Sequence, residues 1–186
     1  MIESKLFERI DFSNQKFPCD VYENCQFSNW NFYSSNLVDV TFRECRFDDC
    51  DFSLASMKNT ALSDIQFVGC KLVGVQFEEC NPFLFSVSFV SCVLKLAIFN
   101  KVKLKKTRFE NCNLQETDFT EADLTASILD NCDLQRAVFL RTILEKADFR
   151  TAFQYSIDPE ANRITKARFS RMGLEGLLDK YRIEIE

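Results

Sequence analysis

Histidine is absent from this chain of 186 residues. Its absence removes the side chain that most often serves as a general base and as a metal ligand. The sequence also contains no glycine-rich phosphate-binding motif. The close cysteine pairs are Cys19 with Cys25 and Cys45 with Cys50, whereas a four-thiolate zinc site needs cysteines about two to four residues apart. We therefore expect no enzymatic activity, no metal and no cofactor.

Long apolar segments are missing as well. No run of apolar residues reaches the roughly 18 residues that span a membrane. The first residues, MIESKLFERIDF, lack the apolar stretch of a secretory signal peptide. We therefore expect a soluble protein in the cytoplasm, with no membrane partner.

Glycine is scarce, with only 4 residues, so tight glycine turns do not build this fold. Phenylalanine, in contrast, is abundant, with 20 residues against 4 tyrosines and 1 tryptophan. A periodic pattern explains this imbalance. From Cys92 to Phe149 the chain reads in blocks of five, such as C-N-L-Q-E, T-D-F-T-E and A-D-L-T-A. Each block begins with a small residue and has Leu or Phe in third place.

This period of five is neither helical nor that of an ordinary strand, whose apolar residues recur every three to four or every two positions. Such self-similarity indicates a repeat architecture, in which stacked units bury an apolar face together. If two of every five side chains point inward, the chain bends at every block, and four blocks close a square coil. The cysteines agree with that length, because Cys92, Cys112 and Cys132 lie twenty residues apart.

The tandem pattern resembles the pentapeptide-repeat family from Cys25 to Phe149. The resemblance implies an all-β fold, a right-handed quadrilateral β-helix of about eight coils, followed by a short C-terminal α-helix. Stacked coils rise by roughly 4.8 Å each, so we expect a rod about 40 Å long.

Most of the cysteines occupy the small inward position of their block. Free cysteine behaves as a small apolar side chain, so we expect reduced, buried thiols rather than disulfides. The inward set is Cys25, Cys45, Cys50, Cys70, Cys80, Cys92, Cys112 and Cys132. A single stacked column is expected from Cys50, Cys70, Cys92, Cys112 and Cys132.

Interruptions of the repeat divide the chain into five parts. Residues 1–24 form an irregular first coil, with Lys5, Gln15 and Asp20 in inward positions. Residues 25–80 and 89–169 form two solenoid segments, and residues 170–186 form a cap or dimer element. Between the segments, at 81–88, the repeat slips by two residues, and we expect a small bulge with Pro82 at an inward centre.

Two further irregularities concern single coils. Trp30 stands in a small inward position, where it turns outward, plugs the end of the core or marks only a local irregularity. In the last coil Gln154, Pro159 and Asn162 take inward positions, which predicts a distorted coil.

The last residues change period, and Ser170 is suited to cap a short helix. Ile183 and Ile185 alternate with charges as in a short strand. This tail covers the open end of the core, and it also suits a homodimer contact. The resemblance implies the latter, because in quinolone-resistance members of the family a C-terminal helix joins two solenoids tip to tip. The expected interface is Met172, Leu174, Leu177, Leu178, Tyr181, Ile183 and Ile185.

Charge is unevenly distributed although the net charge is only -5. Residues 83–109 contain six bases and no acid, with acidic segments on both sides. This basic belt is either an ordinary solvated surface or a contact for a phosphate or an acidic partner. Its members are Lys95, Lys101, Lys103, Lys105, Lys106 and Arg108.

Two functions follow from these observations. The resemblance implies a DNA-mimicking protein that binds a type II topoisomerase, DNA gyrase or topoisomerase IV, and protects it from quinolones or toxins. The alternative is a general protein-interaction or regulatory scaffold. An unbroken acidic row along the rod would favour the first, and an apolar or basic patch would favour the second. Neither function requires direct contact with nucleic acid.

Overall fold

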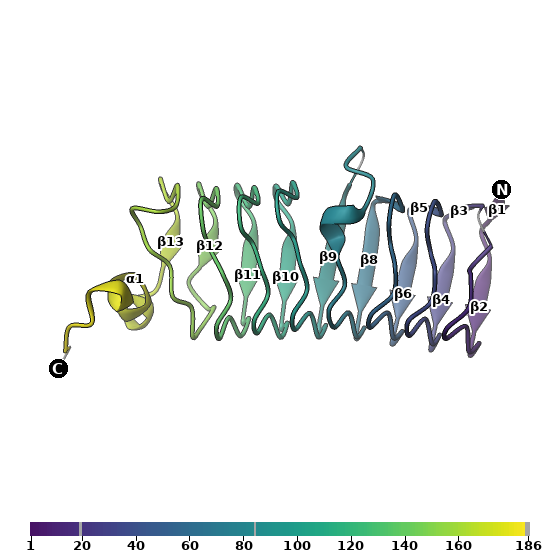
Figure 1. The fold of residues 1–186 in the computed structure, drawn as a ribbon, viewed down its shortest axis with the longest axis horizontal. Coiled ribbons are helices and arrows are strands. Elements are labelled where there is room, and N and C mark those ends of the chain that lie inside the picture. The colour runs from purple at the N-terminus through teal and green to yellow at the C-terminus, as the bar shows by residue number, and fades with distance from the viewer. Residues whose placement is uncertain (19, 84, 185–186) are drawn as a thin grey trace.

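The computed structural model describes residues 1–18, 20–83 and 85–184. The chain winds into a parallel β-solenoid, a rod with the N-terminus at one tip and a short helical tail at the other (Figure 1). The predicted all-β fold of about eight coils with a short C-terminal helix is confirmed. Residues one coil apart face each other, as Phe27 of one coil faces Phe47 of the next.

Each coil has four sides, which we number in chain order. Side 1 is a 4-stranded sheet of β1 (Ile2–Glu3), β3 (Val21–Glu23), β5 (Thr41–Arg43) and β7 (Ala61–Ser63), continued by bridges from Lys103 through Asp123 and Ile143 to Arg163. Side 2 is a 9-stranded sheet of β2 (Leu6–Glu8), β4 (Gln26–Ser28), β6 (Arg46–Asp48), β8 (Ile65–Val68), β9 (Val87–Val90), β10 (Arg108–Glu110), β11 (Ile128–Asp130), β12 (Asp148–Phe149) and β13 (Arg168–Phe169). Sides 3 and 4 are held by isolated bridges, such as Asn31 with Asp51 and Asn36 with Ser56.

Left-handed residues form the corners between the sides. In one coil Asn24, Asn29, Ser34 and Asp39 have φ values of 50° to 63°. Asn and Asp tolerate this region better than most residues other than glycine. The solenoid therefore turns every five residues with few glycines, as the composition predicts.

The core is a set of stacked columns that follow the five-residue repeat. In the regular coils the third residue of each block is buried, and the phenylalanine rings of successive coils stack on one another. The ring centroids are 4.9 Å apart for Phe27 and Phe47, and 4.6 Å apart for Phe77 and Phe99. Offset stacking of this kind adds to the free energy of apolar burial, so each coil stabilises its two neighbours.

The register slip lies between β8 and β9, where Phe67 faces Phe89 and the coil therefore contains 22 residues. The extra residues follow a 3₁₀ helix, η1 (Phe77–Glu79), in a turn whose described residues are 81–83 and 85–86, and this turn projects from the rod (Figure 1). The expected small bulge with Pro82 inside is wrong, because Pro82 is exposed. Extruding these residues preserves the stacking of Phe67 on Phe89, at a centroid distance of 5.4 Å.

The first coil avoids burial of its polar residues. Lys5 and Gln15 are exposed and Asp20 is partly exposed, so none of the three is buried in the inward position that the five-residue count gives it. Burying them without partners would be costly. Trp30 is 5% exposed and packs against Phe12, with centroids 6.1 Å apart, so of the three alternatives it plugs the core.

The last coil also differs from the expected pattern. Gln154 is exposed and left-handed, so its predicted inward placement is wrong, and Tyr155 and Ile157 are buried in its place. Pro159 is only partly buried. Asn162 is buried as predicted, and its Nδ2 donates to the carbonyl oxygen of Phe139 at 3.0 Å.

The tail consists of three short helical pieces, η2 (Arg171–Gly173), α1 (Glu175–Leu178) and η3 (Asp179–Tyr181). Ser170 caps the first piece as predicted, since its Oγ accepts a hydrogen bond from the Gly173 nitrogen at 3.1 Å. The strand expected around Ile183 does not form, and Ile185 lies outside the described residues. Among the described helices, none has the length and apolar character needed to cross a membrane.

Candidate interaction surfaces

The basic belt does not form a patch on one face. Its six residues lie on one coil and are spread over all four sides: Lys95 on side 3, Lys101 at the corner after side 4, Lys103, Lys105 and Lys106 on side 1, and Arg108 on side 2. The belt therefore encircles the rod, and a single partner surface cannot contact all six.

Ion pairs to the next coil compensate four of these six bases. The nitrogen–oxygen distances are 3.1 Å for Lys95 with Glu116, 3.8 Å for Lys101 with Glu121, 3.2 Å for Lys105 with Asp123 and 3.8 Å for Arg108 with Asp130. These groups are largely exposed, so each pair contributes little to stability. Their effect is to neutralise much of the belt, which leaves Lys103 and Lys106 without an ion pair within the described chain.

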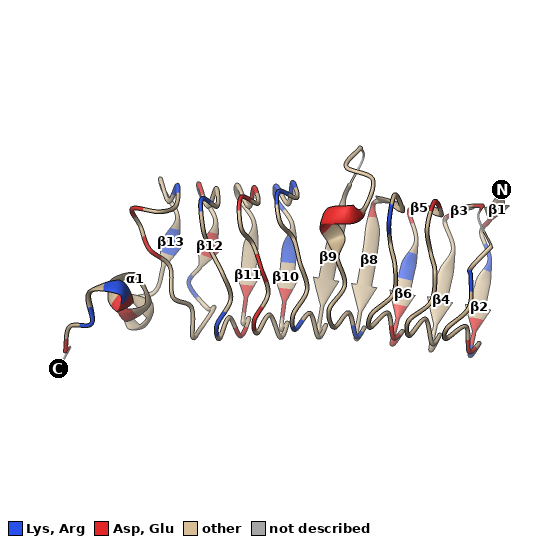
Figure 2. Cartoon of the chain, in the orientation of Figure 1, with Lys and Arg blue, Asp and Glu red and all other residues tan. Residues whose placement is uncertain are grey.

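The two signs of charge are mixed on the large sheet of side 2. In β6 and β10 a basic segment lies directly beside an acidic one (Figure 2). Arg46 pairs with Asp48 at 2.7 Å, and Arg108 pairs with Glu110 at 2.9 Å. Basic residues also interrupt the acidic residues of sides 1, 3 and 4, so within the described ranges no side carries an unbroken acidic row.

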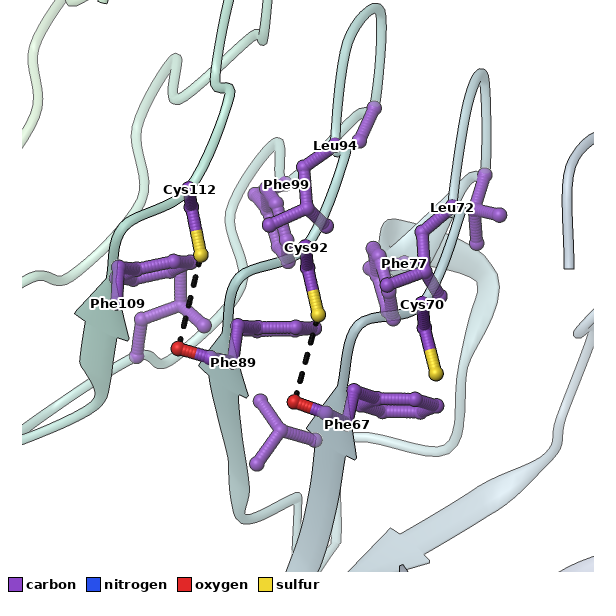
Figure 3. Close-up of a cluster of buried hydrophobic side chains, with 14 of the residues drawn as sticks. Phe67, Cys70, Leu72, Phe77, Phe89, Cys92, Leu94, Phe99, Phe109 and Cys112 are labelled. Carbon is purple, nitrogen blue, oxygen red and sulfur yellow. Dashed lines mark hydrogen bonds between the residues drawn. The ribbon is translucent and has the colours of Figure 1, made fainter. Parts of the chain in front are cut away.

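The cysteine column runs through the core as predicted (Figure 3). Each thiol reaches back to a carbonyl oxygen of the preceding coil: Cys70 contacts the oxygen of Phe47 at 3.3 Å, and Cys92 that of Phe67 at 3.4 Å. The bridge between Lys71 and Val93 keeps the column aligned across the slip. Among the described residues no cluster of potential metal ligands is found.

Polar contacts fasten the tail to the last coil. The Lys180 ammonium lies 2.7 Å from carboxylate oxygens of both Asp158 and Glu160, and the Ser156 hydroxyl donates to Asp179 at 2.6 Å. These contacts raise the pKa of Lys180 and lower the pKa of both of its acidic partners. Polar contacts therefore help to hold the tail on the last coil.

Close packing against Tyr155 explains two of the four glycines. A Cβ atom at Gly173 or Gly176 would collide with the Tyr155 side chain. The Ile157 nitrogen also donates to the Gly176 oxygen at 2.8 Å, which brings the tail backbone against the coil. Burial raises the pKa of Tyr155, whose hydroxyl has no hydrogen-bond partner among the described residues.

The predicted dimer residues of the tail divide into two groups. Leu177 packs against the core, whereas the other described members are exposed, with Met172 at 90%. The exposed group is Met172, Leu174, Leu178, Tyr181 and Ile183. They lie at one end of the rod, beside a groove of about 600 Å³ whose lining includes Arg136, Phe153 and Glu175. Sequence reasoning missed this groove, because Phe153 and Tyr155 stand where the five-residue pattern breaks down.

Comparison with family models gives two matches. A pentapeptide repeat region matches residues 83–156, and a model of pentapeptide repeats (8 copies) matches residues 25–64 and 35–74. Together they span about two thirds of the chain. No curated protein sequence matches significantly.

Solved structures share the fold at low sequence identity. A trypsin-treated variant of QnrB1, a plasmid-mediated fluoroquinolone resistance protein, is 18% identical with a TM-score of 0.54, over 97% of this chain and 99% of that one. HetL from the cyanobacterium Nostoc, a protein involved in heterocyst differentiation regulation, is also 18% identical with a TM-score of 0.60, over 90% and 87% of the two chains. At such identity these likenesses establish the fold alone.

Proposed function

Because the chain belongs to the pentapeptide-repeat family, we propose that it is a non-enzymatic rod that binds another protein. The observation that carries this proposal is the set of exposed apolar side chains on the tail, among them Met172, Leu174 and Tyr181. Apolar side chains gathered at one place on a soluble protein mark an interaction site. The coils behind the tail supply a rigid support for it.

The partner that we propose for this end is a second copy of the chain. The last coil lies on one side of the tail, and a twofold contact would cover the other side with the same residues in both copies. Two rods would then join tip to tip, to a length of about 80 Å at the ladder spacing of roughly 4.8 Å.

Light scattering tests the tip-to-tip contact. We expect Leu174→Asp with Leu178→Asp to abolish it, since two carboxylates would be buried without partners. A matched control is Leu54→Asp with Leu96→Asp, two exposed leucines at corners of side 3. The tail variant should have a smaller assembly mass than the control variant, and equal masses for the two double variants would remove the tail from the contact.

Topoisomerase binding is the second candidate function. The feature in its favour is the rod itself, which in the tip-to-tip pair would be long enough to resemble a duplex segment in an enzyme's DNA groove. The mixed charges of side 2 weigh against a simple DNA mimic and favour the general protein-binding rod.

A supercoiling assay with DNA gyrase separates the two candidates. If the rod is a topoisomerase-binding protein, it should preserve gyrase activity in the presence of ciprofloxacin, and the Leu174→Asp, Leu178→Asp variant should do so less well. Unchanged inhibition at excess of the intact rod would exclude protection of gyrase and leave the general scaffold.

A further inference from the structure

Side 1 carries opposite charges in its two halves. On the N-terminal half, the strands of the 4-stranded sheet and the corners that follow them present mainly acids: Glu3, Glu23, Glu44 and Asp64, with Arg43 as a base. On the C-terminal half, the bridged coils present mainly bases: Lys103, Lys105, Lys106, Lys146, Arg163 and Lys166. The turn above β10 is accordingly blue in Figure 2.

The basic half keeps a real excess of charge. Its acids are Asp123 and Glu145, and they pair with Lys105 and Arg163 respectively. Four lysines on this side therefore have no ion pair within the described chain. They are Lys103, Lys106, Lys146 and Lys166.

The projecting turn, described at residues 81–83 and 85–86, lies at the centre of this side. Four strands, β1, β3, β5 and β7, precede it, and four bridged residues from Lys103 to Arg163 follow it. The Asn81 nitrogen donates to the Thr60 oxygen and the Ser86 nitrogen to the Leu62 oxygen, both at 2.9 Å, which stacks the turn on the coil of β7. Phe83, in this turn, is 79% exposed. A twofold axis through the turn would exchange the acidic half with the basic half.

We propose that side 1 binds side 1 of a second copy in antiparallel orientation, with the twofold axis at this turn. Counting coils outward from the axis, bases meet acids at the first and fourth steps: Lys103 and Lys106 face Asp64, and Arg163 and Lys166 face Glu3. At the second step Asp123 faces Arg43, which has Glu44 beside it, and at the third step Glu23 faces Lys146, which has Glu145 beside it. A self-complementary surface of this kind is what an isologous pair requires.

The exposed ring of Phe83 would be covered in the same antiparallel pair. A residue beside a twofold axis meets its own counterpart, so Phe83 of each copy would lie against the turn of the other. Burial of two large aromatic rings would add apolar free energy to a contact otherwise specified by charge. A foreign acidic partner would match the basic half only, leaving the acidic half unused.

This contact is separate from the proposed tail contact, because the two surfaces share no residue. In the side-by-side pair both tails remain free at opposite ends, so a chain with both contacts forms assemblies larger than a dimer. Disruption of the tail alone should leave a compact dimer, and disruption of side 1 alone should leave a long tip-to-tip dimer.

Charge reversal in the Leu174→Asp, Leu178→Asp background tests the side contact by light scattering. We expect this background to be dimeric, and Lys146→Glu or Glu23→Lys to raise the dimer dissociation constant on the order of tenfold or more. The chain carrying both reversals should recover the original value. Lys71→Glu on side 3 is the matched control and should change nothing. A monomeric background, or no recovery in the double reversal, would overturn the proposal.

A cysteine at the axis gives a second readout. Phe83→Cys should form a covalent dimer on mild oxidation with diamide, because the two thiols meet across the axis. Leu96→Cys, on the opposite side 3 and 47% exposed, is the control and should not. Equal cross-linking of both variants would overturn the antiparallel pair. High salt should reduce the yield for Phe83→Cys, since the screening length falls from about 10 Å at 0.1 M to about 3 Å at 1 M.

Discussion

The middle coils and the last coil obey the same five-residue spacing with different chemistry. In the middle, Cys112 and Leu114 are buried as small and large apolar side chains. In the last coil Asn162 occupies the corresponding small position, and hydrogen bonds replace apolar contact: its Oδ1 accepts from the Thr142 nitrogen at 2.9 Å. The comparison teaches that the solenoid accepts a polar inward residue where the neighbouring coil offers matching backbone groups.

The largest effect should come from truncating a middle-coil centre. Phe109→Ala is expected to lower the free energy of unfolding by roughly 2–5 kcal/mol, since it leaves a cavity in a stacked column. Lys105→Ala, on the outside of the same coil, should change it by about 0.5 kcal/mol or less. Denaturant unfolding gives both values, and equal losses would contradict the observed division into inward and outward positions.

Replacing Asn162, the polar inward residue of the last coil, should lower the free energy of unfolding by less than Phe109→Ala does. Asn162→Ala leaves buried backbone groups of Thr142 and Phe139 without a partner, a loss of about 1–3 kcal/mol. Its counterpart in the middle, Thr142→Ala, removes a hydroxyl that donates to the Phe119 oxygen at 2.9 Å and is the natural control. Hydrogen exchange of the last coil should rise locally in the Asn162 variant, and unchanged exchange there would show that these bonds do not hold the coil.

The rate of thiol alkylation tests whether the inward cysteines are buried. Burial raises the pKa of Cys45 to about 11 and that of Cys80 to about 12. Because the thiolate is the reactive form, both should resist alkylation at pH 8 in the folded protein and react after unfolding. Mass spectrometry after brief alkylation measures this. Rapid modification of Cys45 in the folded chain would contradict its burial.

The smallest expected effect is that of acid on the tail, whose contacts with the last coil should weaken as the pH falls. The pKa values of Asp158 and Glu160 are lowered, chiefly by hydrogen bonds from Lys180. A lowered carboxyl pKa stabilises the folded state above the ordinary pKa, and this contribution is lost as the pH falls through the lowered pKa. Exchange of the tail amides should therefore increase in acid before that of the middle coils. Lys180→Met should reduce this pH dependence, because the remaining hydrogen bonds to Asp158 come from the backbone of residues 160 and 161.

The regular part of the fold was predictable because one short rule is repeated along it. From Cys25 to Phe149 the small and large inward residues identify coil length, core columns and the position of the slip. The ends were less predictable. The five-residue count assigns the inward position to Gln154, but Gln154 is exposed and its neighbour Tyr155 is buried instead. A period describes the average environment of a position, and it cannot show which neighbour fills the space when a polar residue turns outward.

The interaction surfaces were harder to predict than the core. The basic residues are consecutive in sequence, but a coil distributes them around four sides, so sequence proximity does not produce a patch. The charge contrast of side 1 depends on residues twenty or more positions apart, such as Lys106 and Lys146. It becomes visible only when the coils are stacked.

The coil-by-coil ladder also determines how the rod would respond to force. Its interstrand hydrogen bonds run along the long axis, and each coil contacts only its neighbours. Tension between the two ends would load the outermost coil first and peel the coils in succession. Each event should release about 70 Å of chain, the extended length of twenty residues, whereas the 22-residue coil closed by Phe67 and Phe89 should release about 7 Å more. In a pulling experiment, unfolding of the 22-residue coil would therefore appear as one step of greater released length among steps of about equal length.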